Sequence, residues 1–170
     1  MWNDIVLKPE EALVLAALRI LDPRVERIAA QSAQYRAPSR GGFIVKLSGE
    51  NQPIPIGSFG DGMWRMLAIV IALTQCQGGV LLVDEIDTGL HYSVMSRMWK
   101  LMYQVAADLN VQVFATTHSF DCVHSFAALA EESVIPEPIS IQRITAGKTK
   151  AVPYNIDELR AVAAQDIEVR

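Results

Sequence analysis

The chain has 170 residues, of which 51% are hydrophobic and 20% are charged, a composition typical of one globular domain, or of a large piece of one, and unlike that of a disordered chain. Its net charge of −4 gives no overall attraction to nucleic acid. The longest apolar run, within Met66 to Leu73, is too short to span a bilayer, and the opening MWNDIVLKPEEA has acids and a proline where a signal peptide needs an apolar core. We therefore expect a cytoplasmic protein without membrane contact.

The first 50 residues predict a helix and two strands. Pro9 suits the first position of a helix, and Asp22-Pro23 ends it. Val25 to Ala30 and Phe43 to Leu47 are rich in β-formers and are separated by a polar, glycine-containing turn, which predicts two strands.

From Gly60 onward the pattern alternates between helix and strand. A glycine-rich turn leads into an apolar helix, and Gly78-Gly79 ends it. The apolar run Val80 to Val83 is typical of a buried parallel strand. The remaining predicted elements of this part are a helix over Tyr92 to Leu109, a strand over Val111 to Ala115 and a helix over Phe120 to Ala130.

The C-terminal part predicts a hairpin over Ile139 to Tyr154, and Asn155-Ile156-Asp157-Glu158 is a capping box for a last helix. The whole order predicts an α/β fold: a mostly parallel sheet flanked by helices, followed by a hairpin and a helix. Cys76 and Cys122 lie in helical sequence without metal-ligand spacing, so we expect reduced thiols.

Two adjacent carboxylates, Asp84 and Glu85, follow the strand Val80 to Val83. Ligands of open α/β sheets bind at the carboxyl ends of the strands. In phosphoryl-transfer sites one carboxylate holds Mg²⁺ and a second polarises the attacking water. The alternative is a strand end with two solvated acids.

Two further segments strengthen the first interpretation. His118 follows the next strand, where an imidazole can contact a terminal phosphate or simply cap a helix. In Ser58-Phe59-Gly60-Asp61-Gly62, glycines at a helix start let the backbone approach an anion, although an ordinary N-cap has the same pattern.

In this order, the segments SFGDGMWR, VLLVDE, IDTGLH and TTHS resemble the signature, Walker B, D-loop and switch histidine of an ABC-type ATPase head. The similarity is to the SMC-like branch, including the overcoming-lysogenization-defect ATPases and related AAA-labelled domains of prokaryotic defence systems. It is strong over about residues 54 to 123.

The resemblance implies a P-loop NTPase fold and catalytic roles for three residues. Asp84 would hold Mg²⁺, Glu85 would be the general base, and His118 would contact the γ-phosphate of ATP.

The resemblance also implies contacts between subunits. Ser58, Gly60, Asp61 and Gly62 would meet, in trans, a nucleotide held by the opposite subunit of a dimer, and Asp87 and Thr88 would lie at the dimer interface. His91 departs from the transporter pattern, which has an aspartate there, so the transporter D-loop roles do not carry over to it.

The phosphate loop (Walker A) of this class has the pattern G-x-x-x-x-G-K-[ST] between a strand and a helix. The one Gly-Lys-Thr, at Gly147-Lys148-Thr149, has Gln142 where the first glycine belongs, and it lies in the predicted hairpin turn. We therefore expect residues 1–170 to form a single partial ATPase domain, a C-terminal piece that binds ATP weakly and is inactive alone.

Within that partial domain we expect a helix and strands over 1–53, the motif-bearing core over 54–130 and the hairpin and helix over 139–170. Activity would need a partner that supplies the phosphate loop. The alternative is a non-enzymatic pseudo-ATPase module in a DNA-repair or phage-defence complex, with any nucleic-acid contact indirect. Both predict self-association or a partner. Trp2, Trp64 and Trp99 are candidates to line an apolar surface for it, and the alternative for each of them is an ordinary place in the core.

Overall fold

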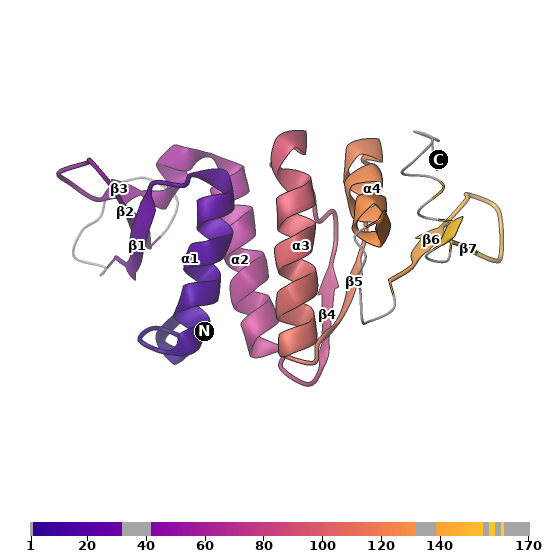
Figure 1. The fold of residues 1–170 in the computed structure, drawn as a ribbon, viewed down its shortest axis with the longest axis horizontal. Coiled ribbons are helices and arrows are strands. Elements are labelled where there is room, and N and C mark those ends of the chain that lie inside the picture. The colour runs from indigo at the N-terminus through magenta and orange to yellow at the C-terminus, as the bar shows by residue number, and fades with distance from the viewer. Residues whose placement is uncertain (1, 32–41, 132–138, 155–156, 159–160, 162–170) are drawn as a thin grey trace.

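The computed structural model describes residues 2–31, 42–131, 139–154, 157–158 and 161. Figure 1 shows the helices α1, α2, α3 and α4 side by side in a row, with small sheets at both ends and the β4–β5 pair beside α3. The predicted last helix lies largely outside the described residues.

The N-terminal part consists of a helix and an antiparallel sheet. After a short 3-10 turn, η1 (Trp2–Asp4), helix α1 (Pro9–Leu21) begins with its proline and two acids in the first turn, as predicted. Strands β1 (Val25–Ala30) and β2 (Phe43–Leu47) have the predicted bounds and pair antiparallel, and β3 (Ile54–Pro55) adds to β2.

The central part alternates between helix and strand, as predicted. Its elements are η2 (Ile56–Phe59), α2 (Asp61–Gln75), β4 (Val80–Val83), α3 (Tyr92–Asp108), β5 (Gln112–Ala115), α4 (Phe120–Ala127) and η3 (Ala128–Glu131). Strands β4 and β5 pair in parallel, with Val83 opposite Ala115. A parallel pair needs a crossover, and α3 provides it.

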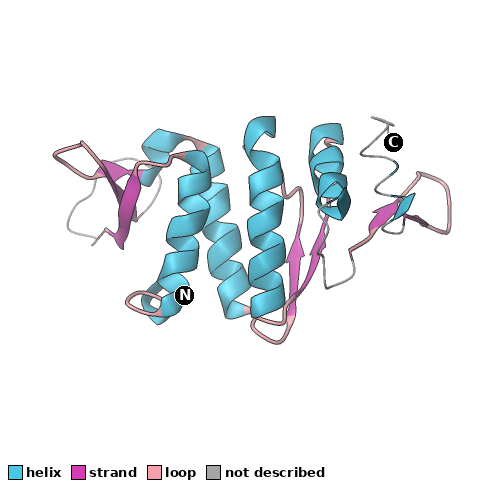
Figure 2. Cartoon of the chain, in the orientation of Figure 1, coloured by secondary structure: helices cyan, strands magenta, loops and turns pink. Residues whose placement is uncertain are grey.

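The C-terminal part is the predicted hairpin, in which β6 (Ile141–Arg143) pairs antiparallel with β7 (Val152–Tyr154) (Figure 2). The α/β class is thus confirmed. The described strands are not mostly parallel: β4 and β5 pair in parallel, whereas the pairs β1–β2, β2–β3 and β6–β7 are antiparallel. In the described part of the chain, no helix is long and apolar enough to cross a bilayer.

One buried cluster joins the helices to the inner side of the β4–β5 pair. Side chains on the inner faces of α1, α2 and α3, such as Leu18, Leu67 and Met98, are fully buried. Leu81 and Val83 of β4 belong to the same cluster. The cluster continues to the N-terminal sheet, so the described N-terminal and central elements share a single core.

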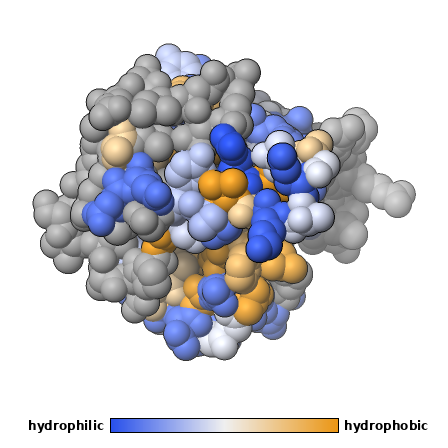
Figure 3. Space-filling model, turned by 90° about the vertical axis from the view of Figure 1, so that its right-hand side faces the viewer, coloured by the Kyte–Doolittle hydropathy of each residue, from blue (hydrophilic) through white to orange (hydrophobic). Residues whose placement is uncertain are grey.

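The other side of the β4–β5 pair carries exposed apolar side chains. Val80 and Leu82 of β4 and Phe114 of β5 are exposed, Leu82 by 74% and Phe114 by 53%. Leu82 and Phe114 are opposite each other in the strand register, so they form one apolar surface, which we call the open face. Figure 3 views the side of the molecule on the right of Figure 1 and shows apolar residues gathered in its centre and lower part.

One expectation about burial is therefore wrong, and one alternative is decided. The run Val80 to Val83 predicts a strand buried on both faces, but its residues alternate between exposed and buried because only one face is covered by helices. Of the tryptophans, Trp2 and Trp99 are buried, which agrees with the core alternative, and Trp64 is half-buried with its ring against Phe43.

Candidate functional site

The two predicted carboxylates are presented at the carboxyl end of β4. Asp84 and Glu85 directly follow Val83, and both are exposed. Glu85 has a φ of 46°, in the left-handed region that residues other than glycine seldom adopt. Such a conformation costs free energy and persists only where its surroundings enforce it.

Thr116 is the first of these enforcing contacts. Its hydroxyl donates to Asp84 Oδ1 at 2.5 Å and accepts from the Glu85 backbone N–H at 2.9 Å. Its backbone continues the parallel ladder, because Thr116 N–H donates to Val83 O and Ile86 N–H donates to Thr116 O. The segment after β5 therefore fixes both carboxylate residues.

Arg65 is the second enforcing contact, from α2. Its Nη2 donates to the backbone carbonyl of Asp84 and, at 2.8 Å, to that of Glu85. The sequence motif SFGDGMWR includes this arginine, but local pattern gives it no role, because its partners lie about twenty residues further along the chain.

The loop after Glu85 is held by hydrogen bonds within the chain. The Thr88 hydroxyl donates to Glu85 Oε2 at 3.2 Å, and the Thr117 hydroxyl donates to Asp87 Oδ1 at 2.5 Å. The predicted D-loop residues Asp87 and Thr88 thus both have partners in their own chain, and their interface role stays a prediction.

The glycine-rich turn lies against this same loop. Gly60 has a φ of 84°, which glycine adopts without strain, and precedes the first residue of α2. Gly62 is buried, and a Cβ atom there would lie 2.5 Å from the carbonyl oxygen of Gly89. The two predicted motifs therefore touch backbone to backbone, while Ser58, Gly60 and Asp61 are exposed.

His118 is exposed and lies between Thr117 and Ser119, on the segment that joins β5 to α4. The Ser119 side chain caps α4 by accepting from the Cys122 N–H, so His118 is not the cap of that helix. His118 lies two residues after Thr116, which hydrogen-bonds to Asp84 and to Val83 at the end of β4, and the role of His118 stays a prediction.

Two neighbouring side chains have structural roles. His91 accepts a hydrogen bond from the Ser93 N–H and so caps α3. Cys122 is buried beneath the site, and burial raises the pKa of its thiol to about 11, against the opposing effect of a hydrogen bond with Thr117. Both cysteines are free thiols, as predicted.

The donor set of the site fits Mg²⁺ of the kind found in phosphoryl transfer. Among the described residues there is no group of three or more metal-ligating side chains. Magnesium in such sites needs only one or two carboxylates, because substrate phosphates and water complete its shell. Asp84 meets that need, since it is exposed and Thr116 hydrogen-bonds to its Oδ1.

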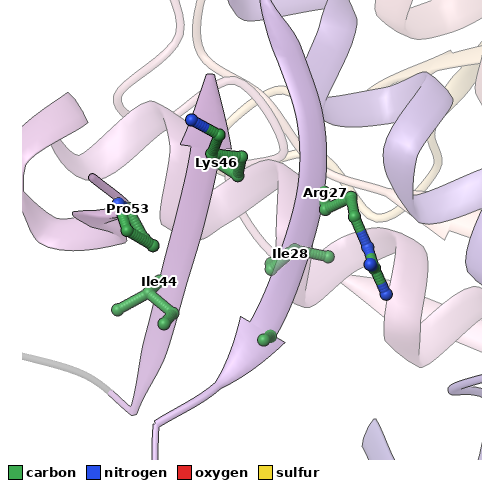
Figure 4. Close-up of a pocket in the computed structure, with 6 residues that line it drawn as sticks. Arg27, Ile28, Ile44, Lys46 and Pro53 are labelled. Atoms are coloured by element: carbon green, nitrogen blue, oxygen red, sulfur yellow. The ribbon is translucent and has the colours of Figure 1, made fainter. Parts of the chain in front are cut away.

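A shallow pocket lies elsewhere, on the N-terminal sheet (Figure 4). Arg27 and Ile28 of β1, Ile44 and Lys46 of β2, and Pro53 line it. The Lys46 amine donates to the carbonyl of Glu50, and no acidic or nucleophilic side chain lines the pocket. We therefore assign no catalytic role to this pocket.

Comparisons with known proteins agree with the sequence-based resemblance. A family model described as "AAA domain, putative AbiEii toxin, Type IV TA system" matches residues 12–121. An ATP/GTP phosphatase of Helicobacter pylori is 35% identical over 78 residues, which are 44% of this chain and 21% of that protein. The match thus spans about a fifth of the length of that curated relative.

Solved structures of SMC ATPase heads have the same fold. A chain from the work on ATP-driven dimerization and DNA-stimulated activation of SMC ATPases aligns with 92% of this chain and 90% of its own length, with a TM-score of 0.53 and 13% identity. The Smc head bound to the C-winged helix domain of ScpA aligns with 89% of this chain and 44% of its own, with a TM-score of 0.57 and 16% identity. The fold is therefore that of a P-loop NTPase of the SMC-head type.

Proposed function

The chain belongs to the AAA-domain family whose model it matches, and from this premise we propose that it carries the metal- and water-handling half of an ATPase site. The observation that carries the proposal is the pair of exposed carboxylates, Asp84 and Glu85, fixed at the carboxyl end of β4 by Thr116. A merely solvated strand end needs no such fixation.

Each residue has a distinct task in this proposal. Asp84 would hold Mg²⁺, which when bound neutralises charge on the β- and γ-phosphates of ATP. Glu85 would accept a proton from the attacking water, because its carboxylate is exposed and is held by the Thr88 hydroxyl at Oε2. His118 would donate a hydrogen bond to the terminal phosphate.

A second nucleotide contact would involve the start of α2. By resemblance, the exposed Ser58, Gly60 and Asp61 would meet the nucleotide of an opposite subunit, with Gly62 in the same segment. Backbone N–H groups at a helix start favour an anion. Asp87 and Thr88 would then lie at the interface between the subunits.

The 170 residues contain no G-x-x-x-x-G-K-[ST], so the phosphate loop in this proposal comes from outside them. Consistent with this, the open face leaves apolar side chains of β4 and β5 uncovered. Parallel sheets are ordinarily covered on both faces. We propose that the segment with the phosphate loop covers the open face.

ATP turnover, measured with and without the polypeptide encoded directly upstream, tests the function. The chain alone should be inactive, and a partner with the phosphate loop should restore turnover. Glu85→Gln should then lower kcat by about 100-fold or more, the usual contribution of a general base, and leave ATP binding intact. The matched control is Glu50→Gln, on an exposed loop residue, which should be neutral.

Equal turnover by Glu85→Gln would contradict the general-base role. A partner that binds the open face and restores no turnover would favour the alternative, a pseudo-ATPase module that works by binding alone.

A further inference from the structure

Arg65 is a charged residue in the second turn of α2, and its guanidinium lies against the backbone that carries the two carboxylates. Its Nη2 donates to the carbonyls of both Asp84 and Glu85. The side chain is half-buried, and its Nε is buried without a hydrogen-bond partner among the described residues. Arg65 therefore directs its donors at a backbone turn, and its partners there are carbonyls.

The convergence of two successive carbonyls on one nitrogen depends on the backbone of Glu85. In an extended strand, successive residues face opposite sides and so do their carbonyls. The left-handed φ of Glu85, 46°, breaks this alternation. The conformation of Glu85 and the contact with Arg65 therefore support each other, and without the arginine the strained turn loses the contact that joins it to α2.

The start of α2 also holds the far end of the same loop. Gly62, three residues before Arg65, is in backbone contact with Gly89. The two ends of the segment from Asp84 to Leu90 thus rest on adjacent turns of one helix. A displacement of the first turns of α2 would carry this segment along.

We propose that Arg65 is a positioning residue, which holds Glu85 in its left-handed conformation and ties its carboxylate to the helix that begins with the glycine-rich turn. The structural part stands on the contacts of the chain alone. The catalytic part, that a nucleotide at the start of α2 sets the direction of Glu85, rests on the proposed function.

Native-state hydrogen exchange of the chain by NMR tests the structural part without any ATPase activity. The variants are Arg65→Met, which keeps the apolar stem, and Arg65→Lys, which keeps the charge. The probes are the amides of Ile86 and Leu90, which donate to Thr116 O and Asp87 O. Loss of a charged hydrogen-bond donor should lower their protection about tenfold or more and leave the amides of α3 unchanged. Arg97→Met, on the exposed side of α3, is the matched control.

The carbon chemical shifts of Glu85 give a second readout, because they report its backbone conformation directly. In the arginine variants they should move away from left-handed values. Unchanged shifts with unchanged protection would overturn the proposal, and so would a loss of protection that is equal in α3, since that is general destabilisation. If Arg65→Met does not fold, Arg65→Lys decides, with a smaller loss confined to the same amides.

The catalytic part is tested in the complemented ATPase. Arg65→Lys should lower kcat about tenfold or more at unchanged KM for ATP, because a misplaced base affects the reaction and leaves ground-state binding intact. A change in KM alone would overturn this part. If the wild type shows no turnover even with its partner, the proposed function fails, while the exchange experiment still decides the role of Arg65.

Discussion

The two faces of the β4–β5 pair differ sharply although both are apolar. On one face Leu81 is 8% exposed and joins the core beneath the helices, and on the other Leu82, the next residue, is 74% exposed. A strand with apolar residues on both faces suits a sheet with a layer on each side. The described residues supply one layer only. The difference teaches that, among the described residues, one face of the pair is covered by helices and the other is left exposed.

The candidate carboxylates follow β4 and are held by residues from two other parts of the chain. Arg65 of α2 and Thr116 after β5 both contact the turn at Glu85. The contacts that hold the two carboxylate residues therefore all come from the described residues. In the proposed function, the segment with the phosphate loop would bind the nucleotide, and this chain would supply the carboxylates.

Replacing Leu81 and Leu82 in turn by alanine should give the largest difference in the free energy of unfolding between the two faces. Leu81→Ala should lower the free energy of unfolding by about 2 to 4 kcal/mol, because it opens a cavity in the core. Leu82→Ala should change it by no more than about 0.5 kcal/mol, since the side chain is already in water. Urea denaturation of both variants measures the difference. Equal losses would mean that the open face is covered in solution, for example by a second copy of the chain.

A substitution at the contact between the glycine-rich turn and the loop after β4 should destabilise the fold almost as much as Leu81→Ala. Gly62→Ala would place a Cβ 2.5 Å from the backbone carbonyl of Gly89, and such overpacking should destabilise the fold by about 1 to 3 kcal/mol. Gly49→Ala is the control, because Gly49 has a positive φ but open space around it. Its cost should be limited to backbone strain, about 1 kcal/mol. A neutral Gly62→Ala would show that the two motifs do not touch.

The smallest expected effect concerns the buried thiol of Cys122 and the pH dependence of the free energy of unfolding. Burial raises the pKa of Cys122 from 9.0 to about 11, so between these values the unfolded chain loses this proton before the folded chain does. Stability should therefore fall as the pH rises from 8 to 10, by about 1 kcal/mol more in the wild type than in Cys122→Ala. Urea denaturation at both pH values measures it. Parallel losses would mean that water reaches this thiol.

Much of the fold was predictable because its signals are local. The strands Val25–Ala30 and Phe43–Leu47 and the start of α1 at Pro9 have the predicted bounds, since turn residues and helix caps mark them. The crossover that makes β4 and β5 parallel also follows from the alternation of helix and strand. Local pattern cannot tell which face of a strand is covered, so the exposure of Val80 and Leu82 was missed.

The order of motifs predicts Asp84, Glu85 and His118 as site residues, and their roles stay predictions. The contacts that support the two carboxylates were not predictable. The contacts of Arg65 and Thr116 join residues 19 to 32 positions apart, so they depend on how the helix and strands pack. The arginine inside SFGDGMWR was a signal, since a charge on an apolar helix calls for a partner.

A calorimetric titration of the chain with Mg-ATP, alone and with its phosphate-loop partner, tests the central claim most directly. We expect no binding by the chain alone near a dissociation constant of about 1 μM, or about −8 kcal/mol, because the main contacts to the phosphates lie outside it. Binding should arise once the partner is present, and Leu82→Asp on the open face should remove it. Micromolar binding by the chain alone would contradict the claim that these residues hold only half of the site.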